Sequence, residues 1–175
     1  MIDLEFAKKM TEIEDEEVLE FMIDAIINKI EKIIGYPLAK SEETEYIRGV
    51  NTDCLWLKRK PVNDVTEVVV FDEELTEGDY QLRNPENRPH LKLKDRTVPA
   101  GEEAEVTYIA GFEENNLDAD IELLIFNLIN DFKSNLEDGD IESYSFSKIS
   151  VKFTSYMQKQ ENLYFQITEV FGVNI

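Results

Sequence analysis

The sequence predicts an α+β fold: a small helical bundle with an inserted antiparallel β region and an extended C-terminal segment. Apolar residues recur with helical spacing in residues 12–35 and 118–136. Between these two helices, apolar and polar residues of the segment 44–112 alternate as they do in strands. We therefore expect one domain over residues 1–154 and a distinct apolar segment over residues 155–175.

Composition indicates a folded and very acidic protein. The 175 residues include 42% hydrophobic side chains, enough to bury a core, and the formal net charge at pH 7 is -20. Nucleic-acid binding relies on lysine and arginine that release counterions from phosphates, so a protein that clamps DNA is excluded. The sequence shows neither a signal peptide nor an apolar stretch long enough to span a membrane. We expect a soluble, unsecreted protein without an internal disulfide, since Cys54 is its single cysteine.

The first helix, residues 12–35, should begin between Thr11 and Glu16 and end at Gly35. Thr11 and Glu14 have the spacing of a capping box, and the acidic residues around them suit the positive end of the helix dipole. Beside the main apolar stripe lies a second one, formed by Leu19, Ile23 and Ile27. Two interpretations are open: the helix is buried on both stripes in its own domain, or the second stripe contacts a neighbouring subunit.

The β region contains six candidate strands. Turn signals such as Asn84-Pro85 and Pro99-Ala100-Gly101 separate them. The strands are short and closely spaced, which leaves no room for crossover helices, so they must pair antiparallel. The candidates are residues 46–50, 54–58, 65–71, 80–83, 90–94 and 103–110.

The second helix, residues 118–136, has the most regular amphipathic pattern in the chain. Its apolar face, which we expect to be buried, consists of Ile121, Leu124, Ile125, Leu128, Ile129 and Phe132. After a polar break at residues 137–140, residues 143–154 alternate in a way that predicts an extended segment.

The C-terminal segment 155–175 is too apolar to remain in solvent. From Ser143 onward the lysines and carboxylates nearly balance, so almost all of the negative charge lies upstream. Two interpretations are again open: the segment docks on a partner protein, or it folds back on its own core as a last helix. If it docks, the residues predicted to make the contact are Tyr156, Leu163, Tyr164, Phe165, Ile167, Val170 and Phe171.

No catalytic or metal-binding pattern stands out. Among 38 acidic residues, carboxylate pairs such as Asp118 and Asp120 arise by chance, and the acidic stretch 138–142 is typical of a solvated turn. His90 has no serine or cysteine at a motif spacing. We expect no enzyme activity, no cofactor and no metal site, and we place Trp56 in the core. The one basic cluster is interpreted as an exposed strand end that pairs with an acidic neighbour: Lys58, Arg59 and Lys60.

The order of several short motifs is more specific than any one of them. They are the helix end IIGYPL, Pro61-Val62 with Val65 and Val68, Gly78-Asp79-Tyr80, Pro99-Ala100-Gly101 followed by VTYIAGF, and residues 141–153. In this order, the chain from Ile13 to Phe153 resembles the head-tail connector (adaptor) proteins of long-tailed bacteriophages and their prophage relatives. Phe112 stands where that family usually has tyrosine, and the C-terminal residues after 155 match no motif.

The resemblance implies a structural virion protein, not an enzyme. Proteins of this family form a ring, typically a dodecamer, beneath the portal of the DNA-filled head; the ring joins the head to the tail or neck and extends the DNA channel. The implied partners are further copies of the chain, the portal protein and the next neck or tail-completion protein, while genome DNA passes without specific binding. The implied location is the virion neck, after assembly in the cytoplasm of the host bacterium and without a membrane.

In the family, the C-terminal segment commonly reaches into the portal, which would give residues 155–175 their partner. The residues predicted at the interface between subunits are Leu19, Ile23, Ile27, Lys58, Arg59 and Lys60. The alternative function is that of an acidic DNA mimic, which binds and blocks a DNA-binding partner through carboxylates spaced like phosphates.

Overall fold

A computed structural model describes residues 2–86, 88–113, 116–136, 146–159 and 163–171. The chain divides into two compact units: a helical unit, Met1–Leu38 with Glu113–Ile175, and a β unit, Ala39–Phe112. The β unit is thus inserted between the first and second halves of the helical unit, and the predicted α+β class is confirmed. The expected boundary between residues 154 and 155 falls inside a helix instead of between two segments.

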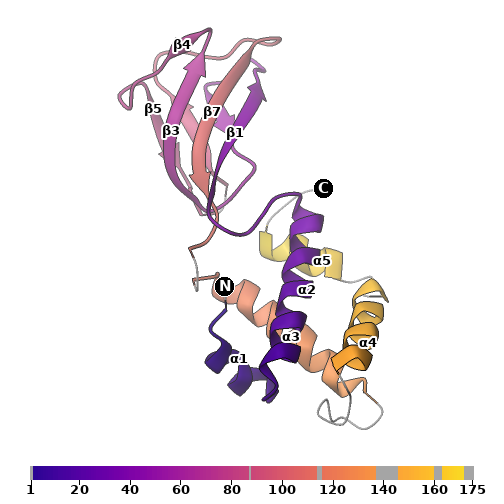
Figure 1. Ribbon diagram of the computed structural model, residues 1–175. Helices are drawn as coiled ribbons and strands as arrows, with labels where there is room; N and C mark the ends of the chain where they lie inside the picture. Colours follow the sequence, from indigo (N-terminus) through magenta and orange to yellow (C-terminus); the bar gives the residue numbers. More distant parts are fainter. Residues whose placement is uncertain (1, 87, 114–115, 137–145, 160–162, 172–175) are drawn as a thin grey trace. The chain divides into compact units, whose positions relative to one another are not determined.

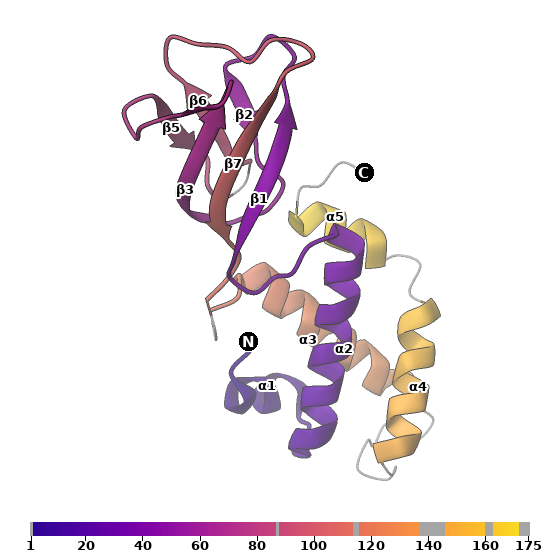
Figure 2. The same cartoon turned by 45° about the horizontal axis from the view of Figure 1, so that its top comes forward.

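The described residues of the helical unit form five helices, of which the second is central. Its helices are α1 (Leu4–Thr11), α2 (Glu16–Ile34), α3 (Ala119–Ser134), α4 (Phe146–Lys159) and α5 (Leu163–Phe171). Helix α2 contacts each of the other four, and Figures 1 and 2 show it lying across α3 with α1 and α4 on either side. This central position explains the two apolar stripes of α2, because both Leu19 and Ile23 are buried within their own chain.

The predicted start of the first helix is wrong, because two helices occupy this region. Asp3 caps α1 by accepting hydrogen bonds from the backbone N–H groups of Glu5 and Phe6. Helix α1 ends at Glu12, which has a left-handed backbone with φ 54°. Asp15, not Thr11, then caps α2. Thr11 instead closes α1, where its buried hydroxyl donates to the backbone oxygen of Ala7 over 2.8 Å.

The predicted extended segment 143–154 is also wrong where the structure describes it. Residues from Phe146 onward form helix α4, and Ile149, Phe153 and Met157 follow one another at four-residue spacing into the core. Phe153 packs edge-on against Phe132 of α3, with ring centroids 4.9 Å apart. Helical packing therefore overrides the local alternation. Residues 143–145 lie outside the described residues.

Helix α3 lies within its predicted range. Asp118 caps it by accepting from the backbone N–H of Asp120, and the helix ends at Ser134. All six apolar residues predicted on its inner face are buried, and Phe126 is buried as well. Phe126 reaches Phe6 of α1, with ring centroids 5.7 Å apart, which extends the core beneath the first helix.

The β unit consists of two antiparallel sheets. One has the strand order β1 (Ser41–Arg48), β7 (Glu103–Ala110), β3 (Val62–Val70) and β4 (Glu73–Glu74); the other has the order β2 (Cys54–Trp56), β6 (His90–Leu93) and β5 (Tyr80–Arg83). Strands β5 and β7 match their predicted limits, whereas β1 starts at Ser41, β3 starts at Val62, and β4 was not predicted. In Figure 2 the first sheet lies in front of the second.

One apolar core fills the space between the two sheets. Leu55, Leu91 and Leu93 enter it from the three-stranded sheet. Strand β7 contributes every second residue from the other side: Ala104, Val106, Tyr108 and Ala110. Since the inner faces meet in this core, the outer faces of the two sheets lie on opposite sides of the β unit.

Candidate assembly surfaces

The basic cluster predicted to be an exposed strand end contains a buried arginine. Arg59 is only 2% exposed, which corrects the prediction. Its guanidinium donates to the backbone oxygens of Ala39 over 3.0 Å and Ala110 over 3.1 Å, and to the Ser41 hydroxyl over 2.8 Å. It also lies 3.5 Å from a carboxylate oxygen of Glu43. Arg59 therefore ties together both ends of the β unit instead of offering a charge to a neighbour.

Tyr108 links the same region to a buried acid. Its hydroxyl donates to the carboxylate of Glu45, which is itself buried, and accepts the backbone N–H of Arg59 over 3.3 Å. The Glu45 carboxylate also accepts the backbone N–H of Lys58 over 3.0 Å. Burial, and then the hydrogen bond to Glu45, raise the pKa of Tyr108 well above its ordinary value. The network holds the start of β1 against β7.

This raised pKa predicts a loss of stability in alkali. The folded state keeps Tyr108 protonated at a pH where the unfolded chain releases the proton, so stability falls as pH rises above about 10. Replacing Tyr108 with phenylalanine leaves Glu45 without this donor and should cost about 1–3 kcal/mol near neutral pH. Urea unfolding of both proteins across this range should show the difference shrinking above about pH 10. A difference independent of pH would contradict the shift.

The outer face of the four-stranded sheet is acidic. Side chains that point away from the core alternate with the buried ones, and pairing across strands brings Tyr46 opposite Glu105 and Arg48 opposite Glu103. Tyr46 is 66% exposed, and its hydroxyl donates to Glu105 over 3.3 Å. We call this surface the acidic sheet face; its charged and aromatic members are five glutamates, one tyrosine and one arginine: Glu42, Tyr46, Arg48, Glu67, Glu74, Glu103 and Glu105.

The outer face of the three-stranded sheet has the opposite character. Trp56, His90 and Arg83 lie in one row across β2, β6 and β5, and Cys54, Lys92 and Gln81 form the next row. Among these outward residues of three fully described strands there is no carboxylate. We call this surface the basic-aromatic sheet face; its members are Cys54, Trp56, Gln81, Arg83, His90 and Lys92.

Trp56 is the most prominent side chain of this face, so its predicted place in the core is wrong. It is 54% exposed and lies against the ring of His90, with centroids 4.5 Å apart and planes inclined by 38°. Lys92 forms an ion pair with Asp53 at the edge of the face. This hydrogen-bonded pair raises the pKa of Lys92 and lowers the pKa of Asp53. Lys92 therefore stays charged at neutral pH.

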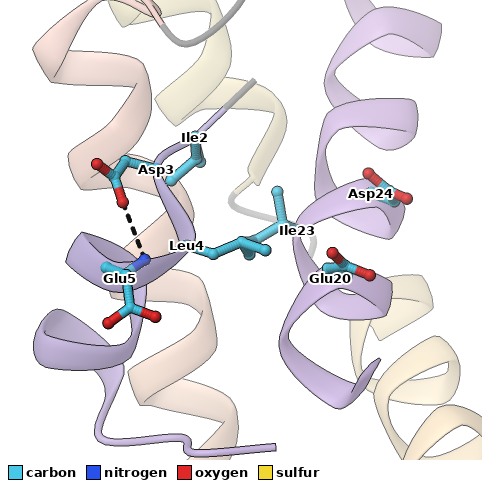
Figure 3. A pocket seen from close by; sticks show the side chains of 7 residues that line it. All are labelled: Ile2, Asp3, Leu4, Glu5, Glu20, Ile23 and Asp24. Carbon is cyan, nitrogen blue, oxygen red and sulfur yellow. Dashed lines mark hydrogen bonds between the residues drawn. The ribbon is translucent and has the colours of Figure 1, made fainter. Parts of the chain in front are cut away.

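The helical unit carries a pocket of about 600 Å³ between α1 and α2. Figure 3 shows Leu4 of α1 and Ile23 of α2 pointing toward each other at its floor, with Ile2 above them. Four carboxylates line it as well: Asp3, Glu5, Glu20 and Asp24. Such a pocket can accept an apolar side chain that has a basic neighbour.

Three of the seven C-terminal residues predicted to dock on a partner are buried in their own chain. Leu163, Ile167 and Phe171 face inward from α5, which contacts α2 and α3. Tyr156 and Val170 are half-buried, and the Tyr156 hydroxyl donates to Asp131 over 2.6 Å. Phe165 is 72% exposed, and the side chain of Tyr164 lies outside the described residues. The described helix of this segment, α5, is thus folded back on the core of its own chain.

The residues predicted at a subunit interface also differ in how far they are buried within their own chain. Leu19, Ile23 and Arg59 are buried within the chain, whereas Ile27 and Lys60 are half-buried and Lys58 is exposed. Sequence reasoning missed the basic-aromatic sheet face. In the sequence, the polar and aromatic residues of 54–58 alternate with Leu55 and Leu57. This alternation could have indicated the face, because it places Cys54, Trp56 and Lys58 on one side of a strand.

Two classes of site find no support in the described part of the chain. No three histidine, cysteine or acidic side chains come together there as metal ligands would. None of the helices described has both the length and the apolar character that crossing a bilayer requires.

Comparison with solved structures reveals several chains of similar fold, among them the following two. One comes from the neck of an empty gene transfer agent (GTA) particle with C6 symmetry: the TM-score is 0.53 and the identity 16%, over 89% of this chain and 88% of that one. The other comes from the neck of a native GTA particle with C12 symmetry, with a TM-score of 0.50 and 17% identity over 86% of both chains. The chain shares its fold with these neck components. No protein-family profile and no curated sequence matches it.

Proposed function

We propose that the protein is a structural neck component of a phage-like particle, which forms a ring beneath the portal and joins the DNA-filled head to the tail. The observation that carries the proposal is the shared fold: 86–89% of this chain aligns with chains from GTA necks. The motif order between Ile13 and Phe153 supports the same function independently, because it rests on the sequence and not on the fold.

The charge of the chain suits the wall of a DNA channel. A net charge of -20 repels the DNA backbone, so DNA can slide past such a wall without adhering. The proposed partners are further copies in a twelvefold ring, the portal, and the next neck or tail-completion protein. The location is the virion neck, after assembly in the bacterial cytoplasm.

Assembly on the portal tests this function. Purified protein is mixed with purified portal rings, and the complex is examined by mass measurement and by class averaging of electron micrographs. We expect added density in a ring on one end of the portal. A chain that stays separate from the portal at every ratio would overturn the proposal, and displacement of the chain from a basic partner by DNA would favour the DNA mimic instead.

Within this function, the exposed side of α5 is one part of the C-terminal segment that can reach the portal. Phe165 projects from this side, while Ile167 two residues later is fully buried. Phe165→Asp should weaken portal binding by about tenfold or more, since exposed aromatic residues often anchor interfaces. Its unfolding free energy should stay within about 0.5 kcal/mol of the original.

Ile167→Ala is the matched variant for this prediction. It removes core contacts and should cost about 2–5 kcal/mol of stability without a specific effect on binding by the folded fraction. Binding is measured with immobilised portal rings at a temperature where both variants are folded. Unchanged binding of Phe165→Asp would exclude this side of α5 from the portal contact.

A further inference from the structure

We propose that the basic-aromatic sheet face of one copy binds the acidic sheet face of the next copy, so that the β units make the repeating contact of the ring. This inference rests on the proposed ring, and it assigns the surfaces that build it. It replaces the buried residues of α2 as the interface between subunits and keeps Lys58 from the predicted set.

The two faces lie on opposite sides of the β unit, which suits a repeating contact between copies. Both belong to the β unit and lie on opposite sides of one apolar core, to which both sheets contribute. A contact between opposite faces of the same body is head-to-tail, and each added copy presents a fresh face to the next. Such a contact produces a closed ring when the small rotation between copies sums to a full turn.

The charges of the two faces also favour a contact between them. Two copies of a protein with net charge -20 repel each other unless they meet where this charge is locally absent or reversed. The outward strand residues of the basic-aromatic sheet face include Arg83 and Lys92 and no carboxylate, although Lys92 is paired with the neighbouring Asp53. Lys58 follows two residues after Trp56 and is exposed, beyond the buried Leu57. Opposed to them in the next copy would be Glu42, Glu67, Glu103 and Glu105.

Exposed aromatic side chains on both faces are suited to an interface. Each face offers one, Trp56 and Tyr46, and both are more than half exposed in the single chain. Trp56 is already held against the His90 ring, and Tyr46 is held by its hydrogen bond to Glu105. Because both rings are ordered before binding, less conformational entropy is lost on contact. Tryptophan, tyrosine and arginine are also the residues that most often dominate interface energies.

Trp56 reports this contact directly, because it is the only tryptophan in the chain. Its emission and the protein mass are followed together from about 1 µM to about 1 mM, the range of weak self-association. We expect the emission to shift to shorter wavelength as the mass rises, since Trp56 leaves water. A rise in mass without a shift would overturn this contact and leave the ring itself standing.

Reversal of charge tests the pairing of the two faces. Lys58→Glu with Arg83→Glu places two carboxylates on one face, and Glu67→Lys with Glu103→Lys places two lysines on the other. Each double variant alone opposes like charges and should associate about tenfold more weakly or not at all. Mixing the two variants restores opposite charges at every contact, so they should assemble together in equal amounts.

Matched variants separate this effect from net charge. Lys9→Glu with Lys148→Glu, and Glu14→Lys with Glu17→Lys, change exposed residues of the helical unit by the same amounts. We expect both to assemble as the original chain does. The inference is overturned if the face variants assemble alone, if their mixture stays monomeric, or if the original chain stays monomeric up to about 1 mM. In the last case, assembly on the portal still decides the proposed function separately.

Discussion

Replacing Arg59 with methionine is expected to destabilise the β unit by about 3–5 kcal/mol. Methionine can fill much of the volume, but it donates no hydrogen bond. The backbone oxygens of Ala39 and Ala110 and the Ser41 hydroxyl would lose their shared donor, and the Ala110 oxygen would be left in a buried position. Hydrogen exchange of the amides of β7 measures the effect, because this central strand should open only when the β unit unfolds.

Two neighbouring substitutions serve as controls for Arg59. Lys58→Met changes an exposed side chain one residue earlier and should stay within about 0.5 kcal/mol of the original protein. Arg59→Lys keeps the charge but loses the planar fork, so it should fall between the two. If Arg59→Met exchanged its β7 amides as slowly as the original chain, the arginine would contribute no net stability to the unit.

Helical periodicity was sufficient to predict the inner face of α3, because a regular amphipathic pattern depends on residues close together in the sequence. The same rule failed for α4. There the helical series of Ile149, Phe153 and Met157 extends beyond residue 154. Residues 143–154 taken alone show only alternation of apolar and polar residues. Helix α1 escaped prediction because eight residues contain few repeats of a helical pattern.

The assembly surfaces were harder to predict, since they depend on contacts between distant residues. Strand alternation places Trp56 and Lys58 on one face, but only the burial of Leu55 against the other sheet shows that this face points outward. The burial of Arg59 cannot be seen in the local sequence, because its partners Ala39 and Ala110 lie 20 and 51 residues away along the chain. Composition alone makes an arginine between two lysines look exposed.

The second large effect is expected for Leu124→Asp, which should unfold the helical unit. Leu124 is 7% exposed on the inner face of α3. An aspartate there would bury a carboxylate among apolar side chains, at a cost of about 4–5 kcal/mol or more. This is comparable with the whole stability of a typical domain, about 5–15 kcal/mol. Loss of the helical circular dichroism signal and of protected amides in α3 would report the unfolding.

The adjacent Leu123 provides a control of the same chemistry. Its side chain is 51% exposed on the outer side of the same helix. Leu123→Asp should therefore change stability by no more than about 0.5 kcal/mol, although it introduces the same charge one residue away. A soluble Leu124→Asp protein that unfolds cooperatively at the temperature of Leu123→Asp would mean that this face of α3 does not form the core. Because the two variants share composition and net charge, any difference between them arises from burial alone.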